Sequence, residues 1–184
     1  MRYYLRLTRG QAQNAEGLEL LRLALWKQDA GKPDVEVDHV TAVSGQPGRQ
    51  NFLKARDRWP GSLQPLGEAV YKLGDHDSQR GVNWASGVVG SYSGSFGPGL
   101  GPVWVAILPK SPDKFGIRSF DFGIHQDDNE DYSPGTSGCC GIQGETGPRD
   151  YGRLRRVVGW FLSFTVEELV VDWGLGTVPR PGGH

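Results

Sequence analysis

The residues best suited to covalent chemistry are a histidine and a cysteine that lie close together in the sequence. His125 ends an apolar run, and after ten intervening residues comes the segment 136–142, which contains Gly138 and Cys139. A thiol becomes a strong nucleophile where an imidazole and backbone dipoles favour the thiolate, and a neighbouring glycine lets peptide N–H groups approach a developing oxyanion. This spacing predicts nucleophilic catalysis. The alternative is a cysteine that is merely packed in the interior.

The other chemistry-bearing residues do not form a metal or cofactor motif. The chain has 2 Cys and 4 His, without the Cys-x-x-Cys spacing typical of zinc sites. Residues 127–131 alternate like the start of an EF-hand loop, but Tyr132 and Gly138 stand where that loop needs a glycine and a bidentate glutamate. The glycine-rich residues 97–101 fit no phosphate-binding motif. We therefore expect no metal, no cofactor and a solvated acidic loop.

The composition predicts one folded domain with many turns. The length is 184 residues, with 28 Gly and 12 Pro. The 20 basic and 21 acidic residues give a net charge of −1, so no overall field attracts nucleic acid or an anionic membrane. The longest apolar stretch, 157–164, is too short to cross a bilayer, and the N-terminus lacks a secretory signal pattern. We expect a single domain over 1–178, a flexible tail over 179–184, no nucleic-acid partner and no membrane insertion.

Alternating and β-branched runs predict a mainly β fold. We expect strands at residues 2–9, 18–26, 39–44, 103–108 and 168–173, the first three forming a meander. The region 81–108, rich in Gly, Ser and aromatic residues, is expected to be core sheet fed by ordered loops. Residues 151–162 have apolar positions at helical spacing, which predicts a helix that begins about ten residues after Cys139.

The histidine and cysteine segments resemble the active-site signature of L,D-transpeptidase (YkuD-type) catalytic domains. That signature is a histidine, a spacer and then Ser/Thr-x-Gly-Cys, matched here by His125 and Thr136-Ser-Gly-Cys139. The resemblance covers about residues 60–162, including a degraded form of the turn that introduces the family's core sheet at 66–71. It is strongest to compact members from bacteriophages and secreted antibacterial effectors. It implies an L,D-transpeptidase-like β-sheet core with one helix following the catalytic cysteine.

The resemblance also implies a role for each matching residue. Cys139 corresponds to the nucleophile, and His125 to the general base, whose imidazolium is expected to lower the pKa of the thiol. Gly138 and the Cys139 amide correspond to the oxyanion hole, with Thr136 and Ser137 in support.

Three positions differ from the longer bacterial members of the family. Ser137 stands where they often have a second histidine, Gly141 replaces a frequent arginine, and Cys140 replaces an aliphatic residue. The spacer after the histidine is also shorter. Because neighbouring side chains on a strand point to opposite faces, we expect Cys140 to be the inert, buried neighbour of the reactive cysteine.

The function implied by the resemblance is cysteine acyl transfer on peptidoglycan stem peptides. Resolution of the thioester by water would give L,D-peptidase or endolysin-like cleavage, and resolution by an amine would give L,D-transpeptidation. Asp127 and Asp131 are expected to meet the free ammonium of the substrate's diamino acid. Without a signal peptide, delivery to the wall would use a lysis system, a secretion system or a virion. The alternative function is a non-catalytic β domain that binds the cell wall or forms part of a virion.

Overall fold

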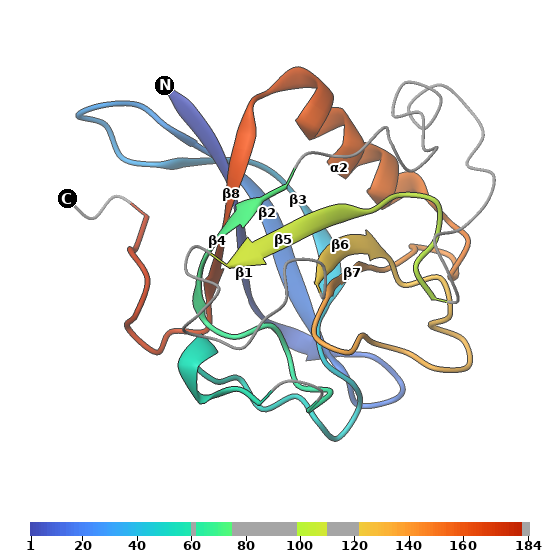
Figure 1. The fold of residues 1–184 in the computed structure, drawn as a ribbon. Coiled ribbons are helices and arrows are strands. Elements are labelled where there is room, and N and C mark those ends of the chain that lie inside the picture. The colour runs from blue at the N-terminus through green and yellow to red at the C-terminus, as the bar shows by residue number, and fades with distance from the viewer. Residues whose placement is uncertain (60–61, 75–98, 110–121, 182–184) are drawn as a thin grey trace.

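The computed structural model describes residues 1–59, 62–74, 99–109 and 122–181, and its main element is a closed β-barrel (Figure 1). The strand order around the barrel is β1-β2-β3-β7-β6-β5-β4-β8. The bounds are β1 (Arg2–Gln13), β2 (Glu19–Gln28), β3 (Val35–Val43), β4 (Ala69–Leu73), β5 (Val105–Pro109), β6 (Gly123–Gln126), β7 (Cys140–Ile142) and β8 (Val166–Asp172). The predicted mainly β fold is confirmed, whereas closure into a barrel was not predicted.

The first three strands form the antiparallel meander that the sequence predicts. In the β1–β2 turn, the side chain of Asn14 accepts a hydrogen bond from the backbone N–H of Leu18 at 2.8 Å. Leucine favours helices, but in β2 Leu21, Leu23 and Leu25 are buried at alternate positions. Burial of this alternating face outweighs the helical preference of the individual residues.

Two strand pairs in the barrel are parallel. β1 pairs with β8, and β6 pairs with β7. Parallel neighbours need a connection that returns the chain to the end at which it started. Residues 127–139 make that return between β6 and β7, which lie side by side in Figure 1.

The predicted helix is present as α2 (Gly152–Ser163), shifted by one residue from the expected bounds. The side chains of Leu154, Val157 and Phe161 belong to the same hydrophobic core as the barrel strands. Trp160 donates its indole N–H to Asp38 of β3 at 3.0 Å. The helix therefore packs beside β3 before the chain enters β8 (Figure 1).

A buried carboxylate holds the chain that follows β8. Glu68 accepts hydrogen bonds from the backbone N–H groups of Trp173 and Leu175 at 2.8 Å and of Thr177 at 2.9 Å. Burial alone would raise the pKa of Glu68, but these hydrogen bonds outweigh it and leave the pKa below its usual value. The segment after β8 is thus fixed to the start of β4.

Some expectations fall partly or wholly outside the described residues. These are residues 60–61, 75–98 and 110–121 of the family resemblance, which include residues 81–98 of the expected core-sheet region, and residues 182–184 of the expected tail. At the start of that tail, the carbonyl of Pro179 accepts a hydrogen bond from Arg6 at 3.0 Å. Among the helices of the described ranges, none combines the length and apolarity that crossing a bilayer requires.

Candidate active site

The pairing of β6 with β7 places His125 beside the strand that begins directly after Cys139. His125 lies opposite Gly141, and Ile124 lies opposite Cys140. Because side chains alternate along a strand, His125 and Gly141 share one face. Cys139 precedes β7, which begins at Cys140, and its side chain belongs to the hydrophobic core. The register therefore brings His125 next to the strand that carries the cysteine loop, and both His125 and Cys139 are buried.

Cys140 lies on the opposite, inward face. Its side chain is completely buried in the core together with Ile124 and Ile142. Burial raises the pKa of the Cys140 thiol far above its usual value, so this thiol stays protonated. Cys140 is buried as expected, but Cys139 is buried as well, and the reactivity of Cys139 stays a prediction.

Backbone carbonyls contact the His125 ring. The Nδ1 atom lies 2.6 Å from the carbonyl oxygen of Gln126. A carbonyl only accepts hydrogen bonds, so Nδ1 is the donor in this contact. Burial lowers the pKa of His125 to about 4, although the carbonyls of Gln126 and Gly99 act in the opposite direction. At neutral pH the ring is therefore a neutral base and not the imidazolium that we expected.

Trp104 covers the imidazole. Its indole is stacked on His125, with ring centroids 5.6 Å apart and an angle of 11° between the planes. The neighbouring position on β6 must be small, because a Cβ atom on Gly123 would lie 2.5 Å from the Trp104 ring. The glycine of the Phe-Gly-Ile-His run thus provides the space for the residue that excludes water from His125.

A single hydroxyl organises the loop that carries Cys139. The Thr136 hydroxyl donates to the Cys139 carbonyl at 2.7 Å and accepts from the N–H groups of Gly45 and Gly138, each at 3.3 Å. The Thr136 N–H in turn donates to the Gly45 carbonyl at 2.9 Å. Of the two expected oxyanion donors, Gly138 thus directs its N–H toward Thr136. The side chain of Ser137 is exposed.

The structure adds one residue that the sequence analysis missed. Arg58 follows a short 3-10 helix, η1 (Ala55–Asp57), and its side chain is buried. Its guanidinium donates to the Ser137 carbonyl at 3.2 Å and lies 4.8 Å from the ring centroid of Phe122. No motif or spacing links position 58 to Cys139, so only the fold brings this cation to the site.

Gly138 is required by both space and backbone conformation. Its φ angle is +116°, in a region that residues with a side chain rarely adopt. A Cβ atom at this position would lie 2.3 Å from Arg58 Nη2 and 2.6 Å from the Phe122 ring. The glycine before Cys139 therefore allows the guanidinium and the aromatic ring to approach the backbone of the cysteine loop.

The two acidic residues expected to bind an ammonium have different environments. Asp127 is completely buried and accepts a hydrogen bond from the Gly135 N–H at 2.9 Å, whereas Asp131 is exposed. Burial raises the pKa of Asp127 to about 6. At Asp127 the expectation of a solvated acidic loop is therefore wrong, because this side chain is needed to close the loop that returns to β7.

Among the described residues, no group of three or more His, Cys, Asp or Glu side chains could hold a metal ion.

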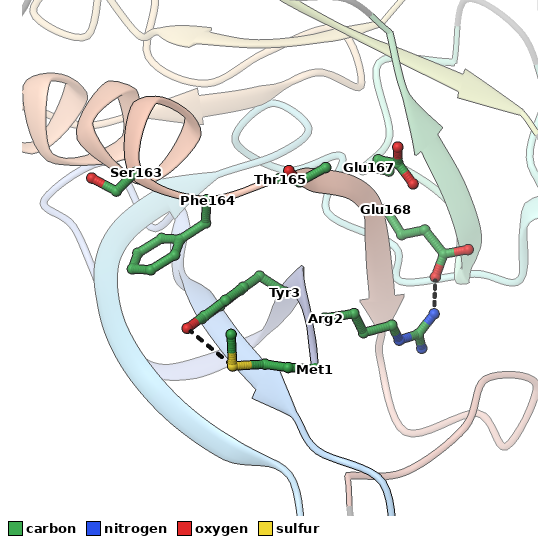
Figure 2. A pocket seen from close by; sticks show the side chains of 8 residues that line it. All are labelled: Met1, Arg2, Tyr3, Ser163, Phe164, Thr165, Glu167 and Glu168. Carbon is green, nitrogen blue, oxygen red and sulfur yellow. Dashed lines mark hydrogen bonds and ion pairs between the residues drawn. The ribbon is translucent and has the colours of Figure 1, made fainter.

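A separate surface pocket of about 570 Å³ lies beside the N-terminus (Figure 2). Tyr3 and Phe164 stack at its wall with ring centroids 4.1 Å apart, and Arg2 pairs with Glu168 at 3.1 Å. Figure 2 shows these side chains coming from β1, from the connection between α2 and β8, and from β8 itself. The pocket holds no cysteine or histidine.

The pocket and the candidate active site are at opposite ends of the strands. Tyr3 is aligned across β2 with Val35, the first residue of β3, whereas Gly141, close to Cys139, pairs with Val43, the last. Nine residues of strand separate these ends by about 26 Å. The His125–Cys139 chemistry therefore does not use this pocket.

Comparisons with family models, with curated proteins and with solved structures gave no match to the chain.

Proposed function

We propose that this protein is a cysteine acyl-transfer enzyme with an L,D-transpeptidase-like fold, and that it acts on peptidoglycan stem peptides. The parallel register of β6 and β7, which places His125 beside the strand that begins directly after Cys139, is the observation that carries this proposal. The match of the segment 136–139 to the Ser/Thr-x-Gly-Cys signature supplies the substrate class.

In the proposed reaction the Cys139 thiol gives its proton to the unprotonated nitrogen of the neutral His125 ring and attacks the carbonyl of an L-to-D peptide bond. The carbon–nitrogen bond breaks, and the leaving amine takes the proton from the imidazole. A water molecule or a second amine then gives a proton to His125 and attacks the thioester, and the thiolate leaves and is reprotonated. The neutral, water-shielded state of His125 suits it to accept protons at both stages.

The test is turnover of purified peptidoglycan fragments, namely tetrapeptide stems and cross-linked dimers, followed by liquid chromatography and mass spectrometry. Wild type is expected to release a D-amino acid or separate the stems, or to exchange the terminal residue when a D-amino acid is added. Cys139→Ala should be inactive. Cys140→Ala is the matched control and should retain activity, because its side chain points into the core.

Equal inactivity of wild type and Cys139→Ala on every fragment would contradict the enzymatic proposal. If both proteins then still pelleted with intact sacculi, the non-catalytic wall-binding domain would replace it.

A further inference from the structure

Arg58 is a buried cation with an unusual set of partners. Its side chain is 7% exposed, and its guanidinium donates to the carbonyls of Pro65, Gln64 and Ser137 at 2.7, 3.0 and 3.2 Å. Within the described part of the chain, no carboxylate forms an ion pair with it. Buried arginines normally have an anionic partner, as Arg6, 3% exposed, has in Asp172. Among the described residues, the positive charge of Arg58 is therefore buried without a carboxylate partner.

The charge lies beside the cysteine loop. Arg58 Nη2 holds the carbonyl of Ser137 and occupies the space next to Gly138, the residue directly before Cys139. Cys139 is as buried as Arg58, with 7% of its surface exposed. Burial lowers the pKa of Arg58, and the nearby Cys139 and Tyr71 oppose that effect. In such a shielded environment, opposite charges interact far more strongly than at the surface.

We propose that the guanidinium of Arg58 is the counter-ion of the Cys139 thiolate. Its part in acyl transfer rests on the function proposed above, but its effect on the thiol does not require a substrate. No covalent bond to Arg58 forms or breaks. The cation stabilises the negative charge on sulfur when the thiol has given up its proton, and again when the thiolate leaves the thioester.

Among the described residues, the other titratable groups on the elements that pack around the cysteine loop do not supply this charge. His125, on β6, is neutral at pH 7 because burial lowers its pKa to about 4. Tyr71, on β4, donates its hydroxyl to the Gly67 carbonyl at 2.8 Å, and burial raises its pKa, so it remains uncharged. Cys140 also stays protonated. Asp127, after β6, is acidic and would oppose a thiolate. Of these described residues, Arg58 is the one that carries a permanent positive charge.

Strand β7 itself has no room for a cation on this face. A Cβ atom at Gly141 would lie 2.8 Å from Thr136 Cγ2 and 3.3 Å from the Cβ of Asp127. A side chain at position 141 would therefore meet Thr136 too closely and be crowded by Asp127. The segment after η1 provides the charge from outside the strand pair.

The experiment measures the ionisation of Cys139 without substrate. Thiolate absorbance at 240 nm is followed between pH 5 and 9 in a Cys140→Ala background. The rate of iodoacetamide alkylation is measured over the same range, with the label assigned to Cys139 by peptide mapping. The variants are Arg58→Met, which keeps an apolar stem without charge, Arg58→Lys, which keeps the charge, and His125→Gln.

The wild-type midpoint is expected to lie below the free-thiol value of about 8.5. Arg58→Met should raise it by one to two pH units, so that alkylation at pH 6.5 slows by about ten- to a hundredfold. Arg58→Lys should retain most of the wild-type alkylation rate, because it keeps the positive charge. If Arg58 acted only through the hydrogen bonds of its guanidinium, Arg58→Lys would be impaired as well. His125→Gln should leave the midpoint in place and abolish turnover of peptidoglycan fragments.

An unchanged midpoint in Arg58→Met, or equal impairment of Arg58→Lys and Arg58→Met, would overturn the proposal. If Arg58→Met does not fold, the ionisation midpoint of Cys139 in wild type is the test. A wild-type midpoint at or above about 8.5 overturns the counter-ion proposal. A raised midpoint in Arg58→Met without any turnover by wild type would leave the counter-ion standing and remove the proposed function. Turnover by wild type together with a thiol midpoint that does not change in Arg58→Met would support the proposed function and overturn the counter-ion proposal.

Discussion

Replacing Thr136 by valine removes the hydroxyl that organises the cysteine loop while leaving a side chain of similar shape. The change breaks the 2.7 Å bond to the Cys139 carbonyl and the two 3.3 Å bonds from Gly45 and Gly138. The site is 5% exposed, so water cannot replace these partners. A buried polar group left without a partner costs about 1–3 kcal/mol. For the two 3.3 Å bonds from Gly45 and Gly138 we take the low end of this range, because long hydrogen bonds are weak. We therefore expect the free energy of unfolding to fall by about 2–4 kcal/mol.

Urea unfolding followed by fluorescence measures this loss. Thr136→Ser keeps the hydroxyl and should recover most of the stability, whereas Ser137→Ala removes a neighbouring exposed hydroxyl and should change the free energy of unfolding by less than about 0.5 kcal/mol. If Thr136→Val unfolds at the same urea concentration as Ser137→Ala, the Thr136 hydroxyl does not hold the loop and the reasoning is refuted.

Three further outcomes follow from the structure. Glu68 has a lowered folded pKa, so its stabilisation is full above the unfolded value near 4.3 and is lost as pH falls through the folded pKa; Glu68→Gln should lower stability at pH 7 by about 2 kcal/mol and weaken this acid dependence in pH-dependent unfolding. Trp104→Leu should expose the imidazole of His125 and move its NMR titration midpoint from about 4 toward 6.5, and an unmoved midpoint would contradict the shielding role. Gly138→Ala should lower the thermal midpoint more than Gly159→Ala, a helical position with open space for a Cβ atom, because only at Gly138 would the methyl group meet Arg58.

The sequence predicts those parts of the fold that depend on local pattern. The alternation of Leu21, Leu23 and Leu25 is visible in any short window, and so is the helical spacing that gives α2. Closure of the barrel has no such local pattern. It needs β8 to pair with β1 and with β4, which are far from β8 in the sequence, and no short window of residues indicates these pairings. Periodicity could therefore suggest a meander and a helix, but not the barrel.

The candidate site divides in the same way. His125, Thr136, Gly138 and Cys139 lie within fifteen consecutive residues, and their spacing is sufficient to nominate them. Arg58 comes from a segment far upstream and reaches the site only because residues around Ala55 pair with those around Glu68. The charge state of His125 also depends on burial, which the identity of the residue does not reveal.

Acylation of Cys139 by a peptidoglycan stem peptide is the most direct test of the acyl-transfer mechanism. The protein is incubated with tetrapeptide fragments, quenched in acid and digested, and the peptide that carries the adjacent cysteines is fragmented by mass spectrometry. We predict a mass increase equal to the stem peptide without its terminal D-amino acid, located on Cys139 and released by hydroxylamine. Consumption of the fragments without any adduct on Cys139, or an adduct on Cys140, would contradict the mechanism.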